Sequence, residues 1–524
     1  MLFHTPIFFG FFAVFFAIYL LSRSQLRLQN TIILIGSYIF YGAWDYRFLI
    51  LIIASTVTDY LAAIGASGTK IKRQDLSKAL LYLIVLSTII LGIDFEENFN
   101  FLLMVYVYAI VLGGIGLYLS NRSADSRKLW LGLSVIVNLG LLGVFKYFNF
   151  FAESLTDLAS TVGVELSYST LAIVLPVGIS FYTFQTMSYT IDVYRKKLEP
   201  SHKLIEVSAY IAFFPQLVAG PIERGAHLLP QFFEKRKIDI AALRTGAYLF
   251  LWGMFKKAVI ADNLAAISDP VFQNPQAFTS GELLVALLAF TFQIYCDFSG
   301  YSDMARGIAR MMGFNLMVNF NVPYVSRTPS EFWRRWHISL SSWLRDYLYI
   351  PLGGNRSSEF KTYRNLFLTM LLGGLWHGAS WTFILWGVAH GSILIIYRLL
   401  KVDELLQKPV GNYLLNTSRN LAMGMLFFTF VVFTWLLFRA QDFTVFSEFL
   451  TRLLSFNDMS GPWLTLIGFI IPLWLHDAYQ AWKDRGEFVH SLPSFVRLNV
   501  VLAIVCCIIF LQPSTDVAFL YFDF

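Results

Sequence analysis

GGLWHGASWT, at residues 373–382, lies between two apolar runs at 366–372 and 383–388. A histidine at the depth of a bilayer is energetically costly unless it has a partner or lines a hydrated cavity, so its default interpretation is functional. Histidine is also the side chain best suited to proton transfer near neutral pH. We therefore interpret His377 as the chemical centre of a membrane enzyme.

The charges around this stretch predict its topology. The segment 304–364 is basic, and Arg398 and Lys401 follow the apolar run 381–397. Because basic loops favour the cytoplasmic side, both ends of 365–397 are expected there, as a hairpin with His377 near its tip. The first arm, 365–376, has about 12 residues, or about 18 Å of helix, and is expected to be too short to span the bilayer.

The composition of the whole chain agrees with a membrane protein. Its 524 residues are 56% hydrophobic and only 14% charged, against roughly 25% charged in soluble domains. The apolar runs lack the period-two alternation of barrel strands, so all spans are expected to be helical. The sequence predicts an all-α polytopic integral membrane protein, forming a single membrane-embedded domain over 1–524.

Lysine and arginine gather in short loops, which explains the net charge of +6 without nucleic-acid binding. The alternation of basic and acidic loops places both termini on the extracytoplasmic side. The first apolar stretch has no basic region before it and is interpreted as a retained span. The three cysteines, Cys296, Cys506 and Cys507, are expected to pack, and no metal-ligand spacing is found.

A second histidine follows a strong helix start. Thr328 and Glu331 form a capping box, and Pro329 fits the first helical position. A continuous amphipathic helix over 328–347 is predicted at the cytoplasmic boundary, with His337 on its apolar stripe. Taken alone, His337 is more often a core histidine bonded to a carbonyl; His377 downstream favours a shared site instead.

Basic and aromatic residues of this predicted helix are candidates for binding a phosphorylated acyl donor. Arginine suits phosphate recognition, while contact with lipid headgroups is an equal alternative on charge alone. The candidate donor-site residues are Arg334, Arg335, Arg345 and Trp336.

Two other polar stretches are candidates for a substrate channel. The stretch 293–303 carries Asp297, Ser299 and Tyr301 near the end of an apolar span, although helix capping is an alternative explanation. Gln216 lies in 215–222, where Gly and Pro interrupt an apolar run; a broken helix around a cavity and close packing through small residues both remain open. Trp376, beside His377, completes the candidate channel.

At these residues the chain resembles the membrane-bound O-acyltransferases, and especially the bacterial branch that acetylates alginate and transfers D-alanine to teichoic acid. EFWRRWHISL (331–340) and GLWHGA (374–379) carry the resemblance, with further matches at 37–44, 175–181, 214–222 and 297–303. The likeness covers roughly residues 1–440, and the C-terminal spans at 441–524 are less distinctive.

The resemblance implies that His377 is the family's essential histidine and His337 its second one. It implies a ring of transmembrane, tilted and re-entrant helices around a thinned central channel, which the acyl donor enters from the cytoplasm. It also implies location in the inner (plasma) membrane of a bacterial cell. A periplasmic partner with a serine-hydrolase-like (SGNH-type) domain is expected as well.

The expected reaction is transfer of an acetyl group from cytoplasmic acetyl-CoA toward an extracytoplasmic polysaccharide, with His377 as general base. No permanently bound cofactor, metal or nucleic acid is expected. Two alternatives remain open: D-alanyl transfer from a carrier-protein thioester to a cell-wall polymer, and a non-enzymatic transporter or flippase. A transporter would more often show paired intramembrane carboxylates or an inverted repeat, and neither is found.

Overall fold

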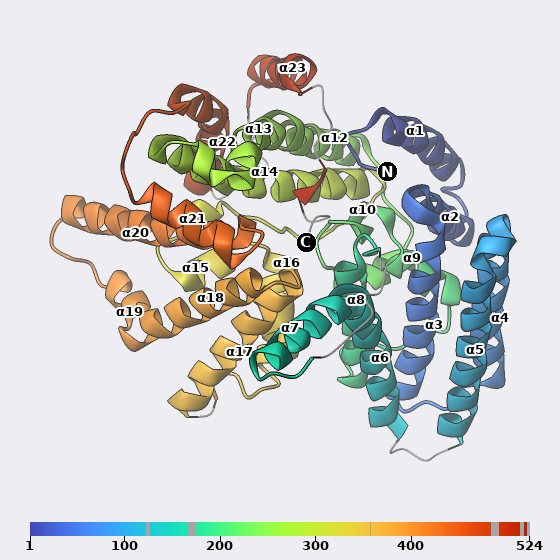
Figure 1. Ribbon diagram of the computed structural model, residues 1–524. Helices are drawn as coiled ribbons and strands as arrows, with labels where there is room; N and C mark the ends of the chain where they lie inside the picture. Colours follow the sequence, from blue (N-terminus) through green and yellow to red (C-terminus); the bar gives the residue numbers. More distant parts are fainter. Residues whose placement is uncertain (122–125, 166–173, 357, 484–491, 514–517, 521–524) are drawn as a thin grey trace. The chain divides into compact units, whose positions relative to one another are not determined.

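A computed structural model describes the chain except for residues 122–125, 166–173, 357, 484–491, 514–517 and 521–524. Helices make up 78% of it, and no strand occurs in the described ranges (Figure 1). Seven helical stretches among these residues are long and apolar enough to cross a membrane. The predicted all-α polytopic membrane fold is therefore confirmed.

The chain forms two compact units, described separately below. The first comprises 1–243 with 308–316, and the second comprises 244–307 with 317–524. The predicted single domain over 1–524 stays a prediction.

The first unit is built around α3 (Leu49–Ala66), whose residues are almost all buried. Among the helices of the unit, α3 packs most extensively against α6, α8 and α4. Its carboxylate Asp59 accepts hydrogen bonds from Asn138 Nδ2 at 2.6 Å, from Thr190 Oγ1 at 2.7 Å and from Ser134. A charge-bearing group in an apolar helix is thus satisfied by neutral donors. The other helices are α1 (Pro6–Leu21), α2 (Leu26–Asp45), α4 (Arg73–Leu91), α5 (Phe95–Ser120), α6 (Ser126–Leu142), α7 (Phe148–Thr161), α8 (Ile179–Tyr194), α9 (Leu204–Ile211), α10 (Phe214–Leu217) and α11 (Gly225–Leu228).

The second unit contains both candidate histidines. Its α17 (Glu359–His377) and α18 (Trp381–Leu399) form the most extensive helix pair, and α20 (Tyr413–Arg439) packs on α18. The π-helical turn η5 (Phe255–Ala261) lies between the ends of α12 (Ile240–Met254) and α13 (Asp262–Gln273). The remaining helices are α14 (Ser280–Met311), α15 (Pro329–Trp333), α16 (Ile338–Leu344), α19 (Val402–Gln407), α21 (Phe443–Leu453), α22 (Trp463–Lys483) and α23 (Ser494–Leu511).

The predicted hairpin at 365–397 is present, but its first arm is longer than expected. α17 starts at Glu359 and has 19 residues, which gives about 28 Å of helix. The expectation of a half-length arm is wrong because the polar turns around Lys361 and Asn365 are helical as well. Ser358 caps this helix by accepting from the Lys361 backbone N–H.

Glycines allow the two arms of the hairpin to touch at backbone distance. A Cβ at Gly374 would lie 2.3 Å from the Phe383 carbonyl oxygen, and one at Gly387 would lie 2.5 Å from the Met370 oxygen. No side chain fits at those distances, so small residues are required at this crossing. The close crossing holds the end of α17 firmly against α18.

Candidate active site

His377 is the last residue of α17 and faces a cavity. The backbone leaves the helix at Gly378, where a Cβ would lie 2.2 Å from the Phe383 ring, so the turn is tight. The imidazole is surrounded by aromatic rings, with centroid distances of 5.1 Å to Trp376, 5.1 Å to Trp386 and 5.2 Å to Phe438. These contacts restrict the orientation of the ring.

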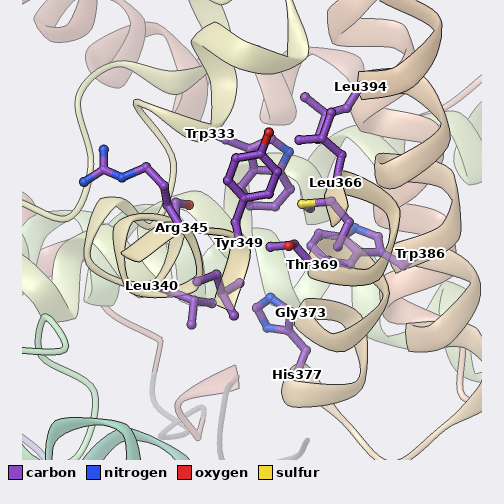
Figure 2. A pocket seen from close by; sticks show the side chains of 13 residues that line it. Trp333, Leu340, Arg345, Tyr349, Leu366, Thr369, Gly373, His377, Trp386 and Leu394 are labelled. Carbon is purple, nitrogen blue, oxygen red and sulfur yellow. The ribbon is translucent and has the colours of Figure 1, made fainter. Parts of the chain in front are cut away.

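The cavity beside His377 has a volume of about 200 Å³ and is mostly apolar. Figure 2 shows the imidazole directed into it, with the hydroxyl of Thr369 and the rings of Tyr349 and Trp333 further along. Such a cavity can receive a narrow, largely uncharged chain whose end reaches the imidazole. Its lining residues are Trp333, Leu340, Ser341, Leu344, Arg345, Tyr349, Leu366, Thr369, Met370, Gly373, His377, Trp386 and Leu394.

His337 lies in a different setting. It is fully buried, does not line the cavity, and has left-handed backbone angles of φ 43° and ψ 54°. Its Nδ1 lies 3.1 Å from Asn319 Oδ1, which also accepts from the backbone N–H of Ser339 at 3.2 Å and from its hydroxyl at 2.9 Å. Because an amide oxygen only accepts, the His337 proton is assigned to Nδ1. Burial lowers the pKa of His337 to about 3.

The predicted continuous helix over 328–347 is wrong, and Asn319 explains why. The Ile338 N–H donates to the Asn319 carbonyl at 2.9 Å, and the Asn321 N–H donates to the Arg335 carbonyl at 2.9 Å. These backbone groups would pair within an uninterrupted helix, but the loop at 319–321 takes them instead. The chain therefore forms α15 and α16 with His337 at the break. The predicted start is confirmed: Thr328 accepts from the Glu331 N–H and Pro329 is the first residue.

The two histidines meet on one indole. The Trp376 ring lies 5.9 Å from the His337 ring and 5.1 Å from the His377 ring, measured between centroids. On its other side His337 contacts the Phe298 ring edge-on at 4.6 Å. His377 thus faces the cavity directly, whereas His337 is connected to His377 through Trp376, which does not line the cavity.

The four candidate donor-site residues do not form one site in the structure. Of the four, only Arg345 lines the cavity; it is exposed, pairs with Asp346 at 2.7 Å, and its guanidinium points away from His377 (Figure 2). Arg334 is exposed, and Arg335 donates to the Asn321 carbonyl at 3.3 Å. Trp336 is buried, with its ring 5.6 Å from Phe332. The structure places Trp336 in the aromatic core rather than on the cavity.

The polar stretch of α14 forms ion pairs instead of lining this cavity. Asp297 pairs with Lys257 at 2.8 Å, and Ser299 accepts from Lys256 Nζ at 2.9 Å, both lysines belonging to η5. Tyr301 is buried, 4.9 Å from the Phe519 ring. The capping alternative is wrong because Asp297 and Ser299 lie inside α14. Two adjacent lysines within the apolar run 242–261 were the sequence signal for this network.

Gln216 belongs to the first unit, in the short helix α10. It is buried, and its Nε2 donates to the Tyr210 carbonyl at 3.2 Å. A Cβ at Gly220 would lie 2.4 Å from Gln216 Cα, so the interrupted run is closely packed there. These contacts match the packing alternative.

Sequence reasoning missed several residues around the site. Asn319 holds His337, and Phe519, 6.1 Å from the Phe298 ring, supports the wall behind it. No local pattern identifies such residues, because each acts through a segment distant in the chain.

Comparison with known proteins identifies the family to which the chain belongs. The family description "MBOAT, membrane-bound O-acyltransferase family" matches residues 195–402, which contain both histidines. The chain is also 41% identical to the probable alginate O-acetylase AlgI of Pseudomonas aeruginosa over 468 residues, covering 88% of this chain and 76% of that protein. The chain belongs to the membrane-bound O-acyltransferase family. It is therefore an O-acyltransferase and a multi-pass membrane protein, and the transporter alternative is excluded.

Two further relatives of this acyltransferase are named for other activities. The peptidoglycan O-acetyltransferase of Helicobacter pylori is 31% identical, over 88% of this chain and 81% of that protein. The teichoic acid D-alanyltransferase of Streptococcus thermophilus is 30% identical, over only 42% of this chain and 56% of that protein.

Proposed function

We propose that this acyltransferase takes an acetyl group from cytoplasmic acetyl-CoA and transfers it for O-acetylation of an extracytoplasmic polysaccharide. The observation that carries the proposal is the orientation of His377 into a narrow, mostly apolar cavity. A pantetheine arm is a narrow chain that ends in a thioester, so it matches such a cavity. Relatives with high coverage are named for acetylation of alginate and of peptidoglycan.

In the proposed reaction, a hydroxyl oxygen attacks the thioester carbonyl carbon. His377 takes the hydroxyl proton as the new C–O bond forms, and it returns that proton to the thiolate as the C–S bond breaks. Aromatic contacts hold the imidazole in one orientation, which contributes proximity and alignment. His337 acts as a positioning residue, because its contact with the site runs through Trp376.

Arg345 and Arg334 are proposed to attract the phosphates of the coenzyme. Both are exposed, and Arg345 lies at the cavity itself. Their flexible side chains can reorient toward an anion at low cost, as arginines that recognise phosphate do.

Location in the inner membrane, with both termini outside, is also part of the proposal. It rests on the alternation of basic and acidic loops. A periplasmic partner with an SGNH-type domain is proposed to pass the acetyl group to the polymer. Cells lacking that partner would then accumulate unacetylated polymer.

The second candidate function is D-alanyl transfer from a carrier-protein thioester. The partial likeness to the teichoic acid D-alanyltransferase of Streptococcus thermophilus favours it. Both donors present a pantetheine thioester, so the cavity alone accommodates either. The lower coverage of that relative places this function second.

The test uses the purified full-length chain in lipid nanodiscs with a mannuronate oligosaccharide as acceptor. We expect release of the coenzyme thiol together with transfer of the labelled acetyl group to a hydroxyl of the oligosaccharide. His377→Ala should slow both by about 10²–10⁴-fold. Consumption of D-alanyl carrier protein in place of acetyl-CoA would overturn the proposal in favour of the second function.

A further inference from the structure

A second cavity lies within the first unit, between α2, α4 and α9. Its volume is about 810 Å³. It contains neither histidine discussed above and is unrelated to the reaction just proposed. Its lining residues are Leu26, Arg27, Lys78, Leu81, Tyr82, Val85, His202, Lys203, Leu204, Ile205 and Glu206.

The charged groups of this cavity are predominantly cationic. Arg27, Lys78 and Lys203 are all exposed, and Glu206 is the one lining carboxylate and is buried. Among the described residues, Arg27 and Lys78 form no ion pair, while the Lys203 ammonium lies 5.2 Å from the Phe233 ring. The cavity therefore presents available positive charge from three separate segments.

The two remaining polar lining groups, His202 and Tyr82, already have partners. His202 Nδ1 lies 3.0 Å from Asp75 Oδ2, so this imidazole is bound to a carboxylate beside the cavity. The Tyr82 hydroxyl lies 2.7 Å from that of Tyr38, which leaves the Tyr82 ring as a wall. The positive charge available to a ligand thus comes from Arg27, Lys78 and Lys203, against the single buried lining carboxylate of Glu206.

An apolar track leads away from these cations. Lys78, Leu81 and Val85 are spaced i, i+3 and i+7 along α4, so they share one face of the helix. Leu81 and Val85 are 59% and 49% exposed although they are large and apolar. The cation and the end of the track are separated by about 10 Å along the helix axis. Leu26, Leu204 and Ile205 add apolar surface from the facing helices.

We propose that this cavity binds an anionic phospholipid. The phosphate lies among Arg27, Lys78 and Lys203, and an acyl chain follows Leu81 and Val85. Basic pockets between helices on the cytoplasmic side are suited to acidic headgroups, and the loop charges predict that side for these residues. A soluble phosphate would use the cations alone, so the apolar track points to a lipid.

The test is native mass spectrometry of the full-length chain with added phosphatidylglycerol and, separately, phosphatidylcholine. The triple variant Arg27→Gln, Lys78→Gln, Lys203→Gln should bind phosphatidylglycerol roughly 100-fold more weakly. The matched control, Lys70→Gln, Lys72→Gln, Arg73→Gln, removes the same charge from exposed residues that do not line the cavity. It should bind like the unmodified chain.

A third variant distinguishes binding of a whole lipid from binding of a phosphate group alone. Leu81→Gln with Val85→Gln keeps every cation and should also weaken phosphatidylglycerol binding. Equal loss in the triple variant and its matched control would overturn the proposal, since it would indicate general surface attraction. Unchanged phosphatidylglycerol binding in the Leu81 and Val85 variant would also overturn the proposal, because the cavity would then recognise only the phosphate. Displacement of the lipid by millimolar inorganic phosphate or coenzyme A would lead to the same conclusion.

Discussion

The hairpin α17–α18 and the broken pair α15–α16 each carry one of the two histidines, and they differ in how each histidine is held. His377 ends a regular helix and faces a cavity. His337 sits at a helix break, fully buried, with its ring and neighbouring backbone bonded to Asn319. The comparison teaches that two histidines in similarly specific motifs are held in different ways, which is why we propose that His377 contacts the reacting groups and that His337 orients its surroundings.

The largest effect is expected from His377→Ala, which tests whether this histidine is the general base. We expect the acyl-transfer rate to fall by about 10²–10⁴-fold, the range typical of a general base, with little change in the apparent KM for the donor. His390→Gln is the matched control, because it changes another buried histidine of the hairpin that does not line the cavity. Equal losses in both variants would contradict the assignment.

Asn319→Ala tests the support of His337. Removing the amide oxygen leaves three donors without their acceptor, and each buried orphan costs about 1–3 kcal/mol. We expect a lower melting temperature and a drop in kcat, again with little change in donor KM. A variant that melts normally and turns over normally would show that His337 needs no such support.

The pH dependence of stability tests the burial of His337. The unfolded chain protonates His337 near its ordinary pKa, whereas the folded chain does so only near pH 3, so the unfolded state binds more protons between these values. Stability should therefore fall as the pH drops below about 6.5, by at most about 1.4 kcal/mol per pH unit from this group.

His337→Asn is the comparison variant for that measurement. Asparagine tolerates left-handed backbone angles and does not titrate. Its melting temperature should depend less steeply on pH between 7 and 5 than that of the unmodified chain. If the melting temperatures of the two chains depended on pH in the same way, other groups would dominate the loss of stability at acid pH.

The smallest effect is expected from Phe519→Ala. Phe519 supports Phe298, which in turn contacts His337, so its removal loosens the wall behind the positioning histidine without touching the cavity. We expect a modest fall in kcat, restored by Phe519→Leu. A loss as large as that of Asn319→Ala would mean that this C-terminal segment contributes more to the site than its contacts indicate.

Much of the fold follows from local properties of the chain. Long apolar runs indicate membrane-spanning helices, because unpaired backbone N–H and C=O groups are energetically costly in hydrocarbon and a helix pairs them internally. The caps at Thr328 and Ser358 act within four residues, and Gly374 and His377 belong to one short motif. The hairpin and its histidine were therefore predictable.

What the tertiary structure decided depends on partners far apart in sequence. Asn319 accepts from the backbone N–H groups of Ile338 and Ser339, and the Asn321 N–H donates to the Arg335 carbonyl. These bonds break a helix whose local pattern is continuous. Lys257 neutralises Asp297 across 40 positions of the chain, and Leu520 donates to the same carboxylate at 2.9 Å. Periodicity describes only neighbours along one helix, whereas buried polar groups must find acceptors wherever packing places them. Because of that requirement, Asp297, which was predicted to line a channel, pairs with Lys257 instead. For the same reason the predicted amphipathic helix is interrupted at His337, whose ring is held by Asn319.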